Sequence, residues 1–516
     1  MILRILASFF LVVFSLSKPS SLIASSSEKA PPAAIVIFGA TGDLTARKVL
    51  PAIYQLAEEG DLSAGTVVIG VGRRDYSSLK FRELMREGIE KLSKMQVSDE
   101  KWKAFEKKLF YHRADFDAEE GFEELKAVLK RADFEWGTNG NRVFYLATHS
   151  NSFVPIIQKL SEHGLLYDAK KEEGKWSKVI LEKPFGRDLK SALQLQEKIS
   201  KYLDDSQIYH IDHYLGKAAV QDLFSLRFKN TVFEPLWNNR YIDHVQITIS
   251  EEIGIGTRGQ FWEETGLLRD IFQNHMMQLL SIVAMEPPAS LQAEEIHAEK
   301  VKLLKSVRPF SAKEIDRYIV RAQYGPGESK GQALLGYRQE KGVAEGSTME
   351  TFAAAKLFIE NDRWRGVPFY LRSGKRLDVQ VAEVVISFKN SPNELWIRIQ
   401  PRAGVFLRLA STAPGLVHMG YELDANSEKP SREAYEKLLL ECILGDRSSF
   451  VDAKEQIAAW EILTPVIEHW KNSAMQKIPE YAAGSEGPKE AGLLIAEDGR
   501  RWMRSREKER SSPSPK

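Results

Sequence analysis

A nine-residue segment, 209–217, gathers the side chains of this sequence that best suit a polar ligand. It reads Tyr-His-Ile-Asp-His-Tyr-Leu-Gly-Lys and contains two of the ten histidines of the chain. His213, Tyr214 and Lys217 supply hydrogen-bond donors and up to two positive charges, which suits a phosphate or a polyhydroxyl compound. Asp212 is the kind of carboxylate that orients an imidazole. A structural role, with the aromatic rings in the core and the polar groups in solvent, is the alternative interpretation.

A second segment, 269–275, adds a histidine from another part of the chain. It reads Arg-Asp-Ile-Phe-Gln-Asn-His and opens a helical pattern of apolar residues that continues to Val283. That spacing places His275 partly against the core, where a histidine is more often structural than catalytic. Asp212 offers it a carboxylate partner, and hydride transfer needs a base that works near neutral pH. Both interpretations of His275 follow from the sequence.

The elements that position these residues begin with a strand, a glycine turn and a helix. Residues 34–38 read Ala-Ile-Val-Ile-Phe, an apolar run typical of a buried parallel strand. The turn Gly-Ala-Thr-Gly-Asp-Leu-Thr follows at 39–45, and an amphipathic helix is expected over 47–59. Such a turn lets backbone amides approach a pyrophosphate at the helix N-terminus. Because the third glycine of G-x-G-x-x-G is missing, an ordinary turn is the alternative.

The next expected strand, 66–72, ends in Arg73 and Arg74. In a dinucleotide-binding fold this strand end reaches the adenosine ribose, where an acidic residue selects a 2′-hydroxyl group and an arginine accommodates a 2′-phosphate. Two arginines therefore favour NADP over NAD. Asp75 follows them and leaves room for some use of NAD, and a solvated arginine pair is the structural alternative.

Strands and helices alternate up to residue 205, which predicts an α/β domain over 33–205 with a Rossmann-like, doubly wound parallel sheet. Further strands are expected at 109–112, 142–147 and 179–181, and helices at 120–131 and 153–163. Lys183 ends one of these strands. Ligands of such sheets bind beyond the carboxyl ends of the strands, so Lys183 is placed to face a ligand, although a surface lysine is the commoner case.

Residues 206–500 are expected to form a larger α+β domain. Segments at 245–249, 384–388, 395–399 and 405–409 alternate apolar and polar residues, which is typical of strands with one exposed face and predicts a mainly antiparallel sheet. Helices at 266–285, 346–361 and 431–444 would cover its buried face. Residues 501–516 are polar and rich in Arg, Glu, Ser and Pro, which predicts a disordered tail.

Composition excludes several classes of protein. The chain has 516 residues, enough for two or three domains, and its 43% hydrophobic and 28% charged content is typical of a folded, soluble chain. Lys and Arg number 72 against 71 Asp and Glu, which removes the electrostatic argument for a nucleic-acid-binding protein. Cys442 is the one cysteine, so an internal disulfide and a zinc cluster of thiolates are excluded. We expect no metal site.

Residues 1–32 differ from the rest of the chain. Arg4 precedes an apolar run over 5–16 and a Ser-rich segment that extends to Ser27, which is the order of a secretory signal. An organellar transit peptide and a misassigned start codon are the alternatives. The apolar run is short for a membrane span, and no later window is apolar enough for one, so we expect a mature protein without a membrane segment.

Five motifs together resemble the glucose-6-phosphate dehydrogenase family, and the resemblance extends from about residue 34 to residue 502. They are Gly-Ala-Thr-Gly-Asp-Leu from Gly39, Glu-Lys-Pro-Phe-Gly-Arg-Asp-Leu from Glu182, Ile-Asp-His-Tyr-Leu-Gly-Lys from Ile211, Arg-Asp-Ile-Phe-Gln-Asn-His from Arg269 and Leu-Arg-Ser-Gly-Lys from Leu371. The resemblance implies oxidation of glucose 6-phosphate at C1 to 6-phosphogluconolactone with reduction of NADP, the first step of the oxidative pentose phosphate pathway. It also implies a homodimer or homotetramer and a cytoplasmic location, with export or an organelle as alternatives if the leader is genuine.

The resemblance further implies roles for the residues that match the family motifs. His275 would be the general base and Asp212 the carboxylate paired with it. The substrate-binding residues would be Lys183, His213, Tyr214, Lys217, Glu251, Asp270, Lys375 and Gln380, with His213, Tyr214 and Lys217 in the phosphate-binding group. The coenzyme-binding residues would be Gly39, Ala40, Thr41, Gly42, Asp43, Leu44, Thr45, Ala46, Lys48, Arg73 and Lys183.

Three positions depart from the family pattern. Gln380 stands where a second cation often follows the lysine of the last motif, residues 148–150 replace a proline-containing segment, and Ala218 replaces a glutamate. None of these changes removes a catalytic group, so we expect activity with weaker substrate affinity. Two rival functions stay open: an exported NADP-dependent oxidoreductase of an unphosphorylated sugar, and a catalytically silent NADP-binding regulator.

Overall fold

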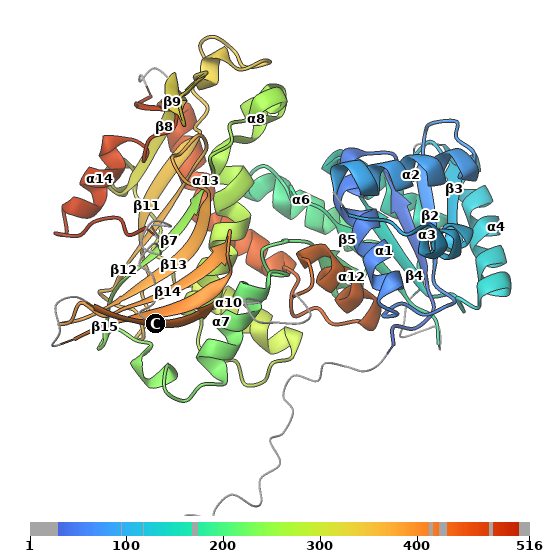
Figure 1. Cartoon of the computed structure of the whole chain (residues 1–516), viewed down its shortest axis with the longest axis horizontal. Coiled ribbons are helices and arrows are strands. Elements are labelled where there is room, and N and C mark those ends of the chain that lie inside the picture. Colours follow the sequence, from blue (N-terminus) through green and yellow to red (C-terminus); the bar gives the residue numbers. More distant parts are fainter. Residues whose placement is uncertain are drawn as a thin grey trace, which may run out of the picture.

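Two large β-sheets and the helices packed on them dominate the protein, described here by a computed structural model (Figure 1). A short third sheet pairs β9 (Gly327–Ser329) with β10 (Gln332–Leu334). The structure describes residues 29–93, 95–116, 118–167, 174–411, 416–422, 431–473 and 478–504. Residues 1–28 of the predicted leader and residues 505–516 of the predicted tail lie outside the described residues. Within the described ranges, no helix is long and apolar enough to cross a membrane.

The first sheet contains six parallel strands in the order β3-β2-β1-β4-β5-β6. They are β1 (Ala34–Phe38), β2 (Val67–Gly72), β3 (Leu109–Arg113), β4 (Arg142–Leu146), β5 (Ser177–Leu181) and β6 (Ile208–His210). β1 lies between β2 and β4, and all five of its residues are buried. A strand that is covered on both faces needs apolar residues at every position, which explains the sequence of β1. The predicted doubly wound parallel sheet is confirmed.

Helices cover both faces of this sheet. They are α1 (Leu50–Glu58), α2 (Ser78–Leu92), α3 (Asp99–Phe105), α4 (Glu119–Trp136), α5 (Phe153–Glu162) and α6 (Leu189–Ile199). Ile35 and Ile37 belong to one apolar cluster with α1, α2 and α3, whereas Val36 and Phe38 belong to another with α4 and α5, because successive side chains of a strand point to opposite faces. The strand order reverses between β1 and β4, which is where such sheets bind their ligands.

The second sheet contains nine strands in the order β16-β15-β14-β13-β7-β12-β11-β8-β17. They are β7 (Ile242–Ser250), β8 (Ile319–Gly325), β11 (Phe352–Phe358), β12 (Pro368–Gly374), β13 (Val381–Phe388), β14 (Glu394–Gln400), β15 (Gly404–Ala410), β16 (Leu416–Glu422) and β17 (Glu480–Ala482). Neighbouring strands are antiparallel except for β7 with β12 and β8 with β17. The predicted mainly antiparallel sheet is therefore confirmed.

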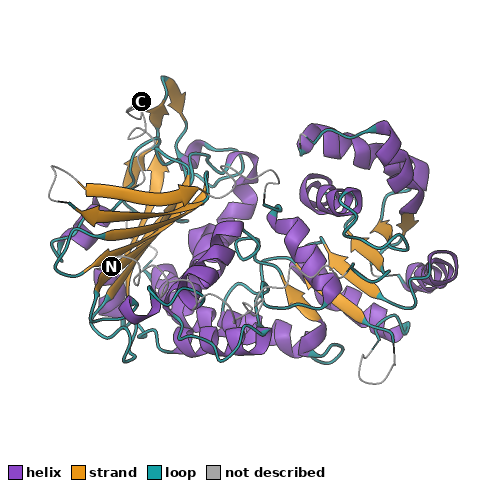
Figure 2. Cartoon of the chain, turned by 60° about the horizontal axis from the view of Figure 1, so that its bottom comes forward, coloured by secondary structure: helices purple, strands orange, loops and turns teal. Residues whose placement is uncertain are grey.

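Helices lie between the second sheet and the first (Figures 1 and 2). The longer helical elements after β6 are α7 (Ala218–Phe228), α8 (Gly259–Leu267), the π-helix η7 (Leu268–Met276), α9 (Met277–Ala284), α10 (Ala293–Lys305), α11 (Ala312–Tyr318), α12 (Ala434–Leu444), α13 (Ala453–Asn472) and α14 (Lys489–Ala496). α13 contacts α6, α10 and η7, so it joins the helices of the two sheets. η7 is thereby held at the boundary between the two halves of the chain.

The prediction of a helix at 346–361 is wrong, because strand β11 occupies Phe352–Phe358. Three consecutive alanines favour a helix locally. The segment instead pairs with β12 on one side and with β8 on the other. Two flanking partners and burial outweigh the local propensity.

Two other helix predictions are corrected in part. The helix predicted at 431–444 exists as α12, but it packs on α1 and β5 rather than on the larger sheet, and Leu438 and Leu439 join the apolar cluster of Ile53. The helix predicted at 266–285 is present from Leu267 to Ala284. Gly266 itself has a φ of 65° and is not helical, and the nine residues of η7 are π-helical rather than α-helical.

Candidate active site

The ends of four strands bring the predicted substrate-binding residues together. Lys183 follows β5 and Asp212 follows β6, and these parallel neighbours end at the same edge of the first sheet. Glu251 follows β7 and Lys375 follows β12, which are parallel neighbours in the second sheet. Side-chain contacts of both pairs with η7 join the two edges into one site.

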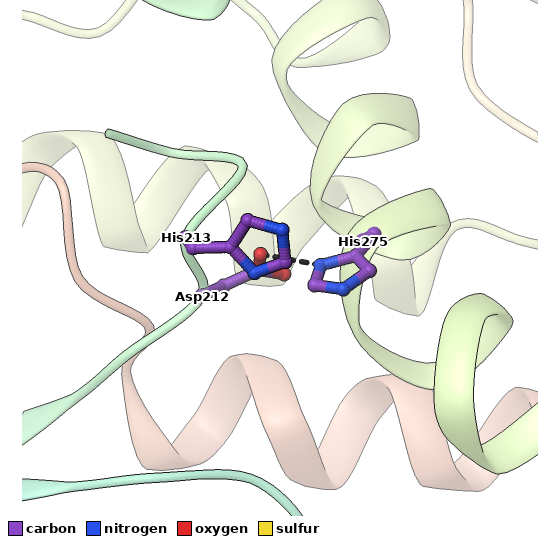
Figure 3. A group of neighbouring side chains, drawn as sticks. All are labelled: Asp212, His213 and His275. Carbon is purple, nitrogen blue, oxygen red and sulfur yellow. Dashed lines mark hydrogen bonds and ion pairs between the residues drawn. The ribbon is translucent and has the colours of Figure 1, made fainter. Parts of the chain in front are cut away.

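Asp212 and His275 form a buried pair at the centre of this site (Figure 3). His275 Nδ1 lies 2.5 Å from Asp212 Oδ1, and on the other side of the ring Lys183 Nζ lies 3.1 Å from His275 Nε2. An ammonium group can only donate hydrogen bonds, so Nε2 accepts and the ring proton is on Nδ1, which donates to Asp212. The hydrogen-bond partners thus assign the tautomer, and Nε2, which accepts from Lys183, is the ring nitrogen that carries no proton.

Burial and neighbouring charges set the protonation states of the pair. Burial lowers the pKa of His275; Asp212 raises it and Lys183 lowers it, and the pKa stays below its usual value. Burial alone would raise the pKa of Asp212, but the electrostatic interaction with His275 and the hydrogen bond from its Nδ1 outweigh burial, so this pKa is also below its usual value. His275 is therefore neutral and Asp212 ionised near pH 7.

The loop after β6 holds Asp212 and its neighbours in place. Asp212 Oδ1 also accepts a hydrogen bond of 2.9 Å from the N–H of Tyr214, and the Tyr214 ring stacks on the His275 ring with 4.3 Å between their centroids. Gly216 lies against the start of α12, where a Cβ atom would come within 2.7 Å of the Ala434 carbonyl oxygen. Only glycine fits there, so α12 helps to set the course of the loop.

The same loop supplies one cation and one neutral imidazole. Lys217 Nζ lies 4.2 Å from the centroid of the Tyr214 ring and donates to Gln400 Oε1, and burial lowers the pKa of Lys217 to about 8. His213 stands edge-on to His275 with 4.6 Å between the ring centroids. Burial, and next the charge of His275, lower the pKa of His213 well below its usual value. At neutral pH, Lys217 carries the positive charge of this group.

Two further carboxylates in the site are balanced by lysines. Lys183 Nζ donates to the carbonyl oxygen of Asp270 at 2.8 Å and to its Oδ1 at 3.1 Å. Lys375 forms an ion pair with Glu251, and its Nζ lies 3.9 Å from Asp270 Oδ2. Burial would raise the pKa of Asp270, but Lys183 and Lys375 outweigh it and hold the pKa below its usual value. Both lysines therefore face acceptors that a sugar hydroxyl group can share.

Gln380, which stands in place of the expected cation, uses its side-chain oxygen within the protein. Its Oε1 accepts a hydrogen bond of 3.2 Å from the N–H of Glu252, so it supports the loop that carries Glu251. The other two departures lie at the starts of helices. Ser150 begins a short 3-10 turn, Ser150–Ser152, and Ala218 begins α7.

The π-helical geometry of η7 aligns two of the site residues. Hydrogen bonds of a π-helix join residues five positions apart, so such residues lie on one side of the helix. Asp270 and His275 are five positions apart, and both lie 3.1 Å from Lys183 Nζ through their side chains. In an α-helix, with 3.6 residues per turn, they would point about 140° apart around the axis. The π-helix is therefore what brings this carboxylate and this imidazole to the same lysine.

Glu350 holds the start of η7, and nothing in the local sequence marks it for this role. Its Oε1 accepts a hydrogen bond of 3.1 Å from the N–H of Leu268, the first residue of η7. Gly266 leaves room for this contact, because a Cβ atom there would come within 2.5 Å of the same oxygen. Burial raises the pKa of Glu350. Leu268 and Glu350 are 82 positions apart, so only the folded chain reveals the contact.

The predicted coenzyme turn lies at the reversal of strand order in the first sheet. Gly39 has a φ of 81°, and a Cβ atom there would come within 2.5 Å of the Ala147 carbonyl oxygen at the end of β4. Thr45 Oγ1 donates to the Gly39 carbonyl oxygen at 3.2 Å, which closes the turn onto the helical turn Thr45–Val49. Backbone amides that precede a helix at this place suit a pyrophosphate group.

The two predicted coenzyme cations differ in their surroundings. Lys48 Nζ lies 2.7 Å from the Glu433 carboxylate, and Arg73 is exposed directly after β2. Asp75, which left room for NAD, forms an ion pair of 3.7 Å with Arg113 at the end of β3. Arg73 and Asp75 are thus both exposed after β2.

Family models match nearly all of the described chain. "Glucose-6-phosphate dehydrogenase, NAD binding domain" matches residues 36–222, and "Glucose-6-phosphate dehydrogenase, C-terminal domain" matches residues 224–503. This chain belongs to the glucose-6-phosphate dehydrogenase family. The family predicted from the motifs is therefore confirmed.

Individual relatives agree with this membership. The glucose-6-phosphate 1-dehydrogenase of Chlamydia pneumoniae is 47% identical over 494 residues, which cover 92% of this chain and 96% of the relative. That of Bacillus subtilis is 40% identical and covers 92% of this chain and 98% of its own. A solved structure of a glucose-6-phosphate dehydrogenase in complex with its substrate glucose-6-phosphate has a TM-score of 0.82 and 33% identity, over 93% of this chain and 100% of that one.

In this member of the dehydrogenase family, the C-terminal part of the chain completes a site that the N-terminal part begins. Gln400 at the end of β14 accepts the hydrogen bond from Lys217, and Glu433 before α12 pairs with Lys48. These partners are 183 and 385 positions apart in the sequence. Because glutamine and glutamate are common surface residues, no local signal could have found either contact.

Proposed function

We propose that this protein oxidises glucose 6-phosphate at C1 and reduces NADP, which gives 6-phosphogluconolactone and NADPH. Membership of the family supports the sugar phosphate and the nicotinamide coenzyme. The observation that carries the chemistry is the Asp212–His275 pair, whose unprotonated Nε2 lies beside Lys183. A base in this state fits the removal of a hydroxyl proton at neutral pH.

His275 is the general base in this proposal. Its Nε2 takes the proton of the C1 hydroxyl group, and the electrons of the broken O–H bond form the C1=O double bond as the hydride leaves C1. The coenzyme, when bound, accepts that hydride at its nicotinamide ring. Asp212 stabilises the imidazolium, and Lys183 Nζ is near enough to Nε2 to hold the same oxygen. Help from a general base typically contributes ~10²–10⁴-fold to a rate.

Two groups of residues around the Asp212–His275 pair bind the two ends of the substrate. His213, Tyr214 and Lys217 bind the phosphate, since Lys217 supplies the charge and the other two supply hydrogen bonds. Asp270, Glu251 and Lys375 bind sugar hydroxyl groups, for which the carboxylates accept hydrogen bonds and the lysine donates them. Gln380 acts indirectly, through the loop that it supports.

The residues of the first sheet fit a dinucleotide. The turn Gly39, Ala40, Thr41, Gly42, Asp43, Leu44, Thr45 and Ala46 binds the pyrophosphate through its backbone amides. Lys48 adds a charge beyond the turn, and Arg73 binds the 2′-phosphate of NADP. The exposed Arg73 directly after β2 supports the preference for NADP, because an arginine at this strand end accommodates a 2′-phosphate.

The assembly and the location of the protein are further parts of the proposal. A homodimer or homotetramer follows from the family resemblance, and light scattering of the purified protein tests it. A cytoplasmic location follows from the same resemblance. Export is the alternative, because residues 1–32 resemble a secretory signal. N-terminal sequencing of the native protein tests the location, since a start at residues 1–2 supports the cytoplasm and a start near residue 25 supports cleavage of a signal.

Initial rates of NADPH formation with purified protein test the proposed reaction. We expect turnover with glucose 6-phosphate and NADP, and far less with unphosphorylated glucose, which separates the proposal from an oxidoreductase of free sugars. His275→Ala is expected to lower kcat ~10²–10⁴-fold. His469→Ala, at a histidine of α13 that binds Asp316 outside the site, is the matched control and should behave like the wild type. NADP binding without turnover in the wild type would refute the proposal in favour of a silent regulator.

A further inference from the structure

Asp212, His213 and His275 bring two imidazole rings and one carboxylate to one place (Figure 3). A ligand atom from each residue lies within 4.8 Å of those from the other two. Two imidazole nitrogens and a carboxylate oxygen are the donors of many zinc and other first-row transition-metal sites. Nothing in the family role of the three residues requires an ion.

The arrangement of the three groups suits a cation. Asp212 Oδ2 is buried and has no hydrogen-bond partner among the residues that the structure describes. The rings of His213 and His275 stand edge-on to each other with 4.6 Å between their centroids, so one ion can reach a nitrogen of each ring.

We propose that Asp212, His213 and His275 bind one divalent transition ion of the zinc type in the substrate-free protein, and that this ion inhibits the enzyme. The ion is an inhibitor rather than a resident cofactor, because it takes up the imidazole and the carboxylate that work as the base. Competition between the ion and the sugar phosphate rests on the proposed function, whereas binding of the ion does not.

Binding of the ion requires the other tautomer of His275. The ring proton moves from Nδ1 to Nε2, Lys183 Nζ turns from Nε2 towards Asp270, with which it is already paired, and a bond forms between Nδ1 and the ion. A nitrogen of His213, an oxygen of Asp212 and a water molecule complete four ligands, as in open zinc sites. Bonds of about 2.0–2.2 Å place tetrahedral ligand atoms about 3.4 Å apart. The contact of 2.5 Å between His275 and Asp212 therefore opens by about 1 Å on binding.

The surrounding charges permit a cation and select its type. Lys183 and Lys217 repel it, but Lys183 is already paired with Asp270 at 3.1 Å, and Lys375 is paired with Glu251. With Asp212, three carboxylates thus face three lysines around the site. Mg²⁺ and Ca²⁺ prefer oxygen ligands, so the two imidazole rings select against them.

Cobalt(II) tests the site by a readout that does not depend on turnover, because four-coordinate Co²⁺ absorbs visible light far more strongly than hydrated Co²⁺. Titration of metal-free protein is expected to give a saturable band at one ion per chain, and added Zn²⁺ is expected to abolish it. Loss of an outer-shell partner typically costs about 10–100-fold in metal affinity, so His213→Gln, which removes a ligand, should cost at least about tenfold. His469→Gln is the matched control and should bind Co²⁺ like the wild type, and circular dichroism verifies that both variants fold.

Absence of a saturable band, or equal Co²⁺ affinity of His213→Gln and the wild type, would overturn the proposal. Saturating glucose 6-phosphate should raise the apparent Kd for Co²⁺ at least about tenfold, since both ligands need His213 and His275. An unchanged Kd would overturn the competition. NADPH formation by metal-free protein is measured separately, so failure of the metal site and failure of the proposed function give different results.

Discussion

Asp212→Asn tests the pair at the centre of the site most directly. The change keeps the size of the side chain and removes its charge, in a buried position 2.5 Å from His275 Nδ1. The amide oxygen of asparagine can accept the Nδ1 proton, or the amide nitrogen can donate to Nδ1 and move the ring proton to Nε2. In both cases the imidazolium that forms during the reaction loses its carboxylate partner.

We expect kcat of Asp212→Asn to fall about 10²–10⁴-fold, the range that general-base catalysis contributes. At about 1.36 kcal/mol per factor of ten, this fall corresponds to a loss of about 2.7–5.4 kcal/mol of transition-state stabilisation. One charge-assisted hydrogen bond contributes about 1.5–3 kcal/mol, so a larger loss indicates that the tautomer has changed as well. KM for glucose 6-phosphate should change less than kcat, because Lys217 is untouched.

The pH profile of kcat/KM gives a second readout. The base must be neutral to accept a proton, so activity is lost as the pH falls through the pKa of His275. Burial lowers this pKa and Asp212 raises it. Removal of the carboxylate therefore lowers the pKa of His275 further, and the acidic limb of the profile shifts to lower pH while the plateau falls.

Initial rates across the pH range, with Asp316→Asn as the matched control, complete the test. Asp316 accepts a contact of 2.8 Å from His469 outside the site, so that variant removes a carboxylate–histidine contact without touching the base. A plateau for Asp212→Asn within about threefold of the wild type would refute the reasoning, since general-base help is larger than that. An acidic limb that moves to higher pH would refute the proposed electrostatics.

Three further variants test other parts of the site. Arg73→Ala should lower kcat/KM for NADP about 10- to 150-fold, because a charge-assisted hydrogen bond contributes about 1.5–3 kcal/mol. The kcat/KM for NAD should stay nearly unchanged. Equal losses with both coenzymes would contradict the 2′-phosphate role of Arg73. Glu350→Ala should lower kcat at least about tenfold, because small displacements of catalytic groups cost up to about 10²-fold in rate. Glu350→Gln keeps the acceptor oxygen, so its kcat should stay near that of the wild type. Similar kcat values for the two variants would show that Glu350 does not position η7. Gly216→Ala should lower the free energy of unfolding in urea by about 1–3 kcal/mol, because its Cβ atom would meet the Ala434 carbonyl oxygen at 2.7 Å. Gly492→Ala, with nothing within 4 Å of the added atom, is its control, and equal stability of the two variants would contradict this packing.

The first sheet was largely predictable from local sequence. Residues 34–38 and 66–72 were predicted as strands, and β1 and β2 match them to within one residue. Strands buried on both faces need apolar, mostly β-branched residues throughout, and this requirement leaves a clear local signal. The second sheet left a weaker signal, so the alanine-rich strand β11 was predicted as a helix although its two neighbours in the sheet decide its conformation.

The types of residue in the site were also present in the sequence, but their contacts were not. The motifs identified Asp212 and His275 through the family, although the two residues are 63 positions apart and no local pattern says that they touch. Glu350, Gln400 and Glu433 carry no motif, and their roles follow only from packing. A contact between distant residues depends on which surfaces fold against each other, which a local pattern does not record.

The sequence by itself therefore determined the family, the coenzyme sheet, the near balance of charge and the side chains available for chemistry. Tertiary structure alone decided how those side chains meet. α12 returns from the C-terminal part of the chain to pack on the first sheet and confine the loop at Gly216. The π-helix η7 places Asp270 and His275 on one lysine, whereas the helical period assumed from the sequence would have separated them by about 140°. The physical reason is that η7 contacts residues distant in the sequence, through the hydrogen bond of Leu268 to Glu350 and the packing of α13, and a local pattern does not contain such contacts.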